Sequence, residues 1–233
     1  MTESAVQQHP QFRTPYRFVR PTVMQRLADA TRAEHQHIER NSLLAQLLQS
    51  DVSVSHYRRV LAGFHGFYRP LETQLLANPD VANHRDLASR LGKHRLLAAD
   101  LRTLEVSARQ CQALPHCEDL PVCKHWHEIL GVMYVLEGAT LGGQLIRKQL
   151  LAHLDARWHG ALRFYSCYGD QVGERWRTFQ QLLAGNLPDD PADEHLSMAI
   201  SAARQTFGLM DNWLARTEVG HYRDTRSSGL LTD

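Results

Sequence analysis

The stretch Ile129–Leu151 reads ILGVMYVLEGATLGGQLIRKQLL, an apolar run that contains four glycines. Its composition is that of a buried helix, yet each interior glycine costs a helix about 1 kcal/mol relative to alanine. At about 100° per residue, Gly131, Gly138 and Gly142 lie within roughly 40° of one another around such a helix. One face therefore presents bare backbone, which a flat or bulky group is able to approach closely.

Two interpretations of this glycine face stay open at this point. Gly138-x-x-x-Gly142 is a small-x-x-x-small pattern, which lets two helices pack with their backbones in contact. The same bare face also suits a flat cofactor that needs a wall without side chains. The spacing alone favours neither interpretation.

The periodicity of the remaining chain predicts an all-α fold. Apolar residues recur at helical spacing, and no period-2 segment of strand length is found. We expect helices over residues 22–41, 42–49, 53–76, 85–91, 93–104, 124–153, 174–184 and 191–216. The expected organisation is an irregular N-terminal arm (1–21), a single-domain multi-helix bundle (22–217) and a flexible C-terminal tail (218–233).

Composition and charge argue against several classes of protein. The 26 Lys and Arg residues nearly balance the 25 Asp and Glu residues, so no basic surface for nucleic acid is expected. The N-terminus has no apolar signal segment, and the apolar runs look too short to span a bilayer, so no membrane partner is expected. The four cysteines show no paired spacing and are interpreted as free thiols, which indicates a cytoplasmic protein.

One of the 14 histidines has a distinctive setting. His35 lies at the border of the apolar face of the first helix, whereas His37 points nearly the opposite way. Glu39 follows His35 by one turn and shares its side. Such a carboxylate can accept the free ring N–H of a histidine whose other nitrogen binds a metal. A structural histidine bonded to Glu39 is the simpler alternative, but a nearby bare wall strengthens the ligand interpretation.

Three segments resemble one family, the heme oxygenases. LADATRAEHQHIE (Leu27–Glu39) resembles their proximal helix, with the pattern L-x-x-A-T-x-x-x-H-x-x-x-E. YVLEGATLGGQLIRK (Tyr134–Lys148) is similar to their distal helix, with its G-x-x-x-G-G-Q core. FYSCYGDQVGERWRTF (Phe164–Phe179) is similar to the bacterial branch that serves bacteriophytochromes. Together the resemblance spans roughly residues 22 to 217.

The resemblance implies that heme is held between the proximal and distal helices and is both cofactor and substrate. O₂ and an electron donor, such as ferredoxin or a reductase, would convert it to biliverdin, CO and free iron, with a bacteriophytochrome as a potential biliverdin acceptor. His35 would be the axial iron ligand with Glu39 behind it. The other site residues that it implies are Gly138 and Gly142 at the distal face, Gly143 at a kink and Arg177 at a propionate. Tyr134 and Phe207 are candidates for lining the pocket, although aromatic residues at helical spacing are more often part of an ordinary core.

The chain also departs from the family pattern. Gln181 and Ala28 stand where the family places further propionate cations, so Arg26 or an arginine of the arm would have to substitute. Ala139 replaces an aspartate that orders distal water in many members. Two alternatives therefore stay open: a heme carrier or sensor that does not degrade heme, and another enzyme on the same scaffold, such as a thiaminase-like enzyme or a quinone-cofactor-forming oxidase.

Overall fold

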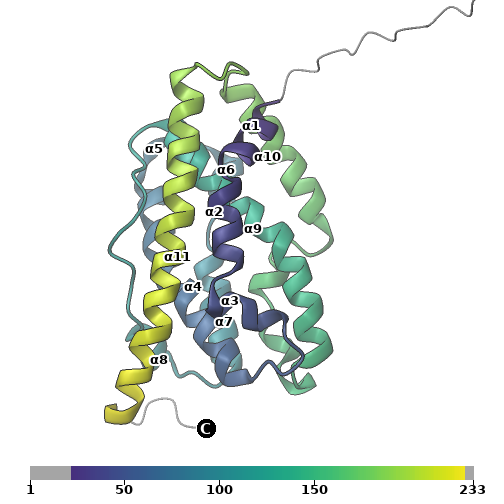
Figure 1. Ribbon diagram of the computed structural model, residues 1–233, viewed down its shortest axis with the longest axis vertical. Helices are drawn as coiled ribbons and strands as arrows, with labels where there is room; N and C mark the ends of the chain where they lie inside the picture. The colour runs from purple at the N-terminus through teal and green to yellow at the C-terminus, as the bar shows by residue number, and fades with distance from the viewer. Residues whose placement is uncertain (1–21, 229–233) are drawn as a thin grey trace, which may run out of the picture.

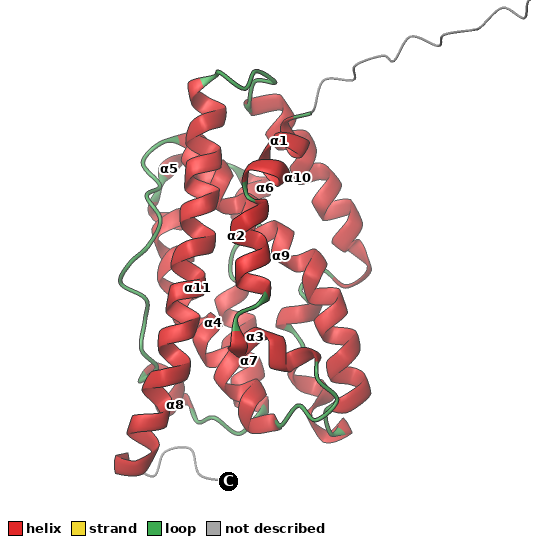
Figure 2. Ribbon diagram, viewed as in Figure 1, coloured by secondary structure: helices red, strands yellow, loops and turns green. Residues whose placement is uncertain are grey.

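The structure, a computed structural model, describes residues 22–228, with side chains described through residue 217. Within this range every regular element is helical, and no strand is found (Figure 2). The expected N-terminal arm lies outside the described residues. The helices are α1 (Val23–Ala30), α2 (Arg32–Glu39), α3 (Ser42–Ala45), η1 (Gln46–Leu48), α4 (Val54–Ala77), α5 (Pro79–Asn83), α6 (Arg85–Ala88), α7 (Lys93–Thr103), α8 (Ala108–Gln112), α9 (Trp126–His153), η2 (Ala156–Ala161), η3 (Phe164–Ser166), η4 (Gly169–Gln171), α10 (Val172–Asn186) and α11 (Glu194–Ser228).

The all-α expectation is confirmed, with more and shorter elements than the sequence predicts. The first expected helix divides at Thr31, whose φ of −103° and ψ of 5° depart from helical values. The Thr31 hydroxyl donates to the Leu27 carbonyl at 2.7 Å, a back-bond of the kind that bends helices. Thr31 is therefore both the C-cap of α1 and the N-cap of α2. At the other end of the chain, α11 continues to Ser228, beyond residue 217 where the domain was expected to end.

α9 is the central helix of the bundle, and it packs most extensively against α11. At their crossing a Cβ on Gly131 would lie 2.1 Å from the Ala199 carbonyl oxygen, so only glycine allows this approach. α9 also contacts α10, η1 and η3. In Figure 1, α11 runs the length of the molecule, and α2 lies between α11 and α9 in this view.

The expectation that no apolar run could span a bilayer is wrong for α9. By length and composition this helix is apolar enough to cross a membrane. Half of its most apolar window is buried inside the bundle, however, because α9 supplies core residues such as Ile129, Met133 and Leu136. A helix surrounded by other helices is apolar for the same reason as a membrane span.

Candidate functional site

The glycine face of α9 divides into a packed part and an open part. Gly131 touches α11, as the packing interpretation requires. Farther along, a Cβ on Gly138 would meet only the Trp176 ring of α10, at 3.9 Å, and a Cβ on Gly142 would meet no described atom within 4 Å. No neighbouring backbone comes close to either glycine, so close backbone packing accounts for Gly131 alone.

Gly143 faces a different neighbour. It is buried, and a Cβ there would lie 3.3 Å from the ring of Tyr165, the middle residue of η3. Gln144 donates to the Tyr165 carbonyl at 3.2 Å, and Arg147 donates to the Ser166 hydroxyl at 2.9 Å. Gly143 therefore belongs to the side of α9 that is fixed to η3, away from the open side of Gly142.

α9 touches the N-terminal helices at both ends of the open part. The Tyr134 side chain contacts the Thr31 side chain, where α1 meets α2. Burial raises the pKa of Tyr134, and the hydrogen bond with Thr31 offsets part of this rise. Beyond Gly142, the Gln149 side chain donates to the Leu48 carbonyl of η1 at 3.1 Å. The two contacts are separated by about 22 Å along the axis of α9.

The surface between these contacts is apolar and exposed. Leu141 is 40% exposed and Leu145 is 58% exposed, although both belong to a helix that supplies much of the core. With Gly138 and Gly142 they follow the spacing i, i+3, i+4, i+7, so they lie on one face of α9. An exposed apolar face of this kind is typical of a ligand site or an interface.

His35 lies on α2 with its imidazole largely exposed, at 56% of the side chain. One side of the ring meets Phe207 of α11 edge-on, with centroids 5.6 Å apart. Its Nδ1 lies 3.5 Å from Glu39 Oε1, which is longer than a good hydrogen bond. Glu39 thus lies beside His35, as their four-residue spacing predicts, and Phe207 contacts the same ring. Within the described part of the chain Nε2 makes no hydrogen bond.

Polar contacts fasten α2 to α11 around this histidine. Glu34 accepts a hydrogen bond from Arg204 at 2.5 Å, and Asp211 pairs with His37 at 3.1 Å. Burial raises the pKa of Glu34, but the hydrogen bond and charge of Arg204 outweigh it, so the net shift is downward. Asn41 also donates to Asp211 Oδ1 at 2.8 Å. These contacts hold α2 in place without engaging the His35 ring.

The expected cations are only partly brought to the site. Arg177 is exposed on α10, directly after Trp176, whose ring borders Gly138. Gln181 is exposed one turn later on the same helix. Arg26 pairs with Asp189 at 3.1 Å, so its charge is already partnered. The arginines of the arm lie outside the described residues.

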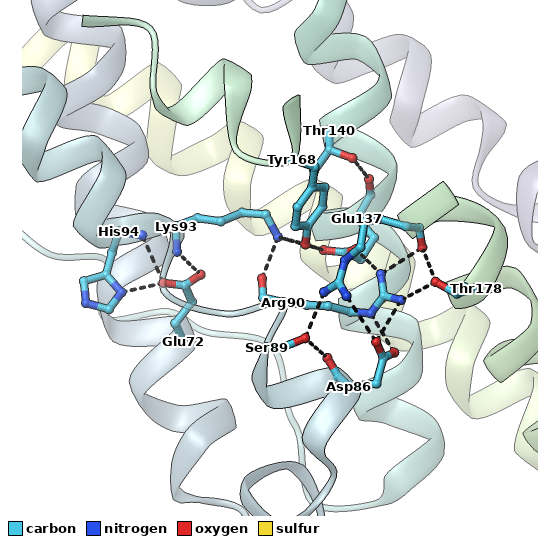
Figure 3. A network of polar contacts seen from close by, with 11 residues as sticks. Glu72, Asp86, Ser89, Arg90, Lys93, His94, Glu137, Thr140, Tyr168 and Thr178 are labelled. Atoms are coloured by element: carbon cyan, nitrogen blue, oxygen red, sulfur yellow. Dashed lines mark hydrogen bonds and ion pairs between the residues drawn. The ribbon is translucent and has the colours of Figure 1, made fainter. Parts of the chain in front are cut away.

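A buried charged network beside the site was missed by the sequence analysis (Figure 3). Glu137, which directly precedes Gly138, is 1% exposed. It accepts hydrogen bonds from Arg90 at 2.6 Å, from Lys93 at 2.7 Å and from Tyr168 at 2.8 Å. A glutamate inside an otherwise apolar run was the available signal, because a buried carboxylate requires cationic or hydrogen-bonding partners.

The cations of this network are held in their charged form. Burial lowers the pKa of Lys93, but the Glu137 carboxylate outweighs this effect and the net shift is upward. The pKa of Arg90 is also raised, since hydrogen bonds to Asp86 and Glu137 outweigh the cost of burial. Lys93 and Arg90 are therefore both cationic at neutral pH.

Comparison with known proteins identifies the family. Residues 22–216 match the family model described as heme oxygenase. Among solved structures, the chain is similar to heme oxygenase-1 from the cyanobacterium Synechocystis sp. PCC6803 in complex with heme, with a TM-score of 0.63 and 15% identity over 88% of this chain and 96% of that chain. At this identity the likeness shows a common fold. A comparison with curated protein sequences gave no match.

The family match covers both helices of the candidate site, and it decides against the other enzymes that share a similar scaffold. It also favours degradation of heme over storage or sensing, because the family is defined by that oxidative reaction. The chain belongs to the heme oxygenase family and is an oxidoreductase that binds heme and degrades it.

Proposed function

We propose that heme binds between α2 and the open part of α9. His35 would be the axial iron ligand, and Gly138 and Gly142 would form the opposite wall, the glycine wall. The reaction would yield biliverdin, CO and free iron from heme, O₂ and externally supplied electrons. The observation that carries this proposal is the pairing of an exposed imidazole on α2 with an open glycine surface on α9, where only the Trp176 ring borders Gly138 and no described atom lies within 4 Å of a Cβ on Gly142.

The residues present fit a porphyrin in shape and polarity. A flat apolar macrocycle needs an apolar surface without projecting side chains, and Gly138 and Gly142 provide it, flanked by the exposed Leu141 and Leu145. The contacts at Thr31 and Leu48 close the two ends of this surface. Burial of the leucines and the macrocycle together would supply the main favourable free energy of binding.

His35 would bind the iron, and Glu39 would orient the His35 ring. Bound heme supplies the iron that activates O₂ and the macrocycle that is cut. The Nδ1 atom of His35 faces Glu39, which leaves Nε2 for the iron. A contact of 3.5 Å orients the ring without a close hydrogen bond between the imidazole and the carboxylate.

We assign the other site residues supporting roles. Arg177 is proposed to bind a propionate, because it is an exposed cation beside Trp176 at the border of the glycine wall. Tyr134 closes one end of the site through Thr31, and Phe207 fixes one side of the His35 ring. Gly143 contributes by letting Tyr165 pack closely against α9.

Ala139 is exposed beside the glycine wall and brings no polar group to it. The hydroxyl of Thr140, the next residue, already donates to the Glu137 carbonyl at 2.7 Å. We therefore propose that backbone carbonyl groups of α9, which are accessible because glycine has no side chain, bind the water on this side of the heme.

The electron donor and the product acceptor are assigned by chemistry. An acidic donor such as a ferredoxin, or a reductase, fits the basic pair Arg147 and Lys148, which follows the glycine wall on α9. The likeness of Phe164–Phe179 to the bacteriophytochrome-associated branch supports a bacteriophytochrome as biliverdin acceptor. A cytoplasmic location is consistent with four free thiols.

The proposal is tested by titrating the protein with heme and recording the Soret spectrum, then adding ascorbate or a ferredoxin system in air. We expect a histidine-ligated spectrum that is lost as biliverdin forms. His35→Ala should abolish the histidine ligation, and added imidazole should restore it. His37→Ala is the control on the same helix and should behave as wild type. An unchanged spectrum in His35→Ala would overturn the ligand assignment.

A further inference from the structure

The Glu137 network joins two helices that the heme site requires. Glu137 lies on α9, immediately before the glycine wall, and its two carboxylate oxygens are occupied by Arg90 and Lys93. Arg90 lies in the short connection between α6 and α7, and Lys93 is the first residue of α7, directly after Gly92, which has a φ of 96°. Figure 3 shows Lys93 and Arg90 converging on Glu137, with the Arg90 guanidinium also bonded to Thr178 and Asp86.

The Arg90 guanidinium spans from α9 to α10. One terminal nitrogen, Nη1, donates to Glu137 at 2.6 Å and to the Arg175 carbonyl at 3.0 Å. The other, Nη2, donates to the Thr178 hydroxyl at 2.9 Å, and Nε donates to Asp86 at 2.9 Å. A guanidinium is planar and rigid, so these bonds fix the positions of α9 and α10 relative to one plane.

The α10 groups that Arg90 holds are placed on either side of Arg177 in the sequence, since Arg175 and Thr178 flank it. The α9 group that it holds, Glu137, adjoins Gly138. The Arg90 guanidinium therefore fixes the position of one turn of α10 along the axis of α9. This turn carries Arg177, and its position is fixed relative to the glycine wall. An apolar contact between α9 and α10 would allow sliding, whereas directional hydrogen bonds do not.

Stability alone does not explain a network of this kind. Buried ion pairs are often no more stabilising than well-packed apolar side chains of the same volume, because the charges lose their hydration. Arg90 has 0% of its side chain exposed, so its desolvation is complete. What such a network offers beyond packing is a defined geometry.

We propose that Arg90 is a positioning residue that sets the in-plane orientation of the heme, and thereby which meso carbon is cut. The proposal rests on the heme site proposed above. An axial ligand leaves a flat macrocycle free to rotate about the iron–imidazole axis, so a propionate contact must fix that rotation. Arg90 determines where the propionate-binding turn lies relative to the wall.

The test compares Arg90→Lys, Glu137→Gln and Thr178→Val with wild type. Lysine keeps the charge but cannot reach α9 and α10 together, and glutamine keeps the shape of Glu137. Valine removes the Thr178 hydroxyl, which accepts from Arg90 and donates to the Arg175 carbonyl at the exposed edge of α10. Arg163→Lys is the control, because this arginine also bonds a buried carboxylate, Asp100 at 3.2 Å, but lies away from the α9–α10 contact.

Three quantities are measured: the ratio of biliverdin isomers by chromatography, the heme methyl shifts in the NMR spectrum of the ferric cyanide complex, and the midpoint of thermal unfolding. We expect Arg90→Lys to lower the share of the major isomer and to change the methyl pattern, while the histidine-ligated spectrum persists. Thr178→Val should change the isomer ratio and the methyl pattern in the same direction as Arg90→Lys, but to a smaller extent. Arg163→Lys should keep the wild-type ratio whatever its stability.

An unchanged isomer ratio and methyl pattern in Thr178→Val and in whichever of Arg90→Lys and Glu137→Gln fold would overturn the proposal and leave a structural role. A wild-type protein that yields a statistical mixture of isomers would overturn it as well. An error in the proposed heme site would give a different result, because His35→Ala would then keep the wild-type ligation spectrum.

Discussion

The rings of His35 and Phe207 meet edge-on, with their centroids 5.6 Å apart and their planes at 80°. Phe207 is 8% exposed and belongs to α11, the longest helix of the bundle. The exposed imidazole therefore leans on a residue of the core. This contact restricts rotation of the ring about its bond to α2, so a ligand approaching Nε2 meets an imidazole that is already oriented.

Phe207→Leu should weaken heme binding while leaving iron ligation intact. Leucine keeps most of the apolar volume but removes the edge-on contact, which is worth about 0.5–1.5 kcal/mol. We expect Kd for heme to rise several-fold in a Soret titration. Phe67→Leu is the control, because Phe67 is fully buried in α4: it should lower the thermal stability without changing the affinity. Equal affinities in both variants would contradict an orienting role for Phe207.

Substitutions at two glycines of the same face should have opposite effects on stability. Gly142→Ala adds a methyl group where nothing lies within 4 Å, so helix propensity should raise the free energy of unfolding by about 0.5–1 kcal/mol. Gly131→Ala places that group 2.1 Å from the Ala199 carbonyl oxygen and should lower it by about 1–3 kcal/mol. Denaturant unfolding of the apoprotein measures both.

The same pair separates stability from heme binding. If Gly142 lines the heme wall, Gly142→Ala should bind heme more weakly although its apoprotein is more stable. A stabilised variant with wild-type affinity would show that the macrocycle lies elsewhere. A stable Gly131→Ala variant would instead contradict the close crossing of α9 and α11.

Electron delivery should depend on the charge at Lys148, which is exposed beyond the glycine wall. Lys148→Glu should slow heme degradation driven by ferredoxin, and the difference from wild type should shrink as salt screens the contact. Degradation driven by ascorbate, which needs no protein docking, is the internal control and should stay at the wild-type rate. An equal slowing with both reductants would place the effect in the site rather than in docking.

The sequence predicted the fold and the two principal helices of the site because both leave local signals. Ser53 caps α4, accepting from the His56 amide at 3.1 Å as its position before an apolar periodic segment predicts. His35 and Glu39 share a side because their four-residue spacing requires it. Pairing within one helix needs no knowledge of the tertiary structure.

Long-range contacts left weaker signals or none. The three glycines of one face are equivalent on a helical wheel, yet α11 covers Gly131 and leaves Gly142 open. Arg90 meets Glu137 across 47 positions in the chain, and no periodicity reports such a pairing. The break at Thr31 depends on a hydroxyl–carbonyl bond in a segment whose apolar pattern continues unbroken.

His65 is a buried histidine outside the heme site. It is 3% exposed on α4, and its Nδ1 has no hydrogen-bond partner among the described residues. Burial is the main cause that lowers its pKa from 6.5 to about 4, and the neighbouring groups Arg69, His116 and His94 contribute to the same shift. His65 is therefore neutral in the folded protein at every pH above this value.

The free energy of unfolding should fall as the pH falls from 6.5 towards 4. In this window the unfolded chain binds a proton at His65 that the folded protein does not, which favours unfolding by about 1.4 kcal/mol for each unit of pKa difference, less where water reaches the ring. His65→Gln, which cannot titrate, should show a flatter dependence in urea unfolding at a series of pH values. His153→Gln, at an exposed position in the last turn of α9, should keep the wild-type slope. A slope that persists in His65→Gln would assign the acid sensitivity to other groups.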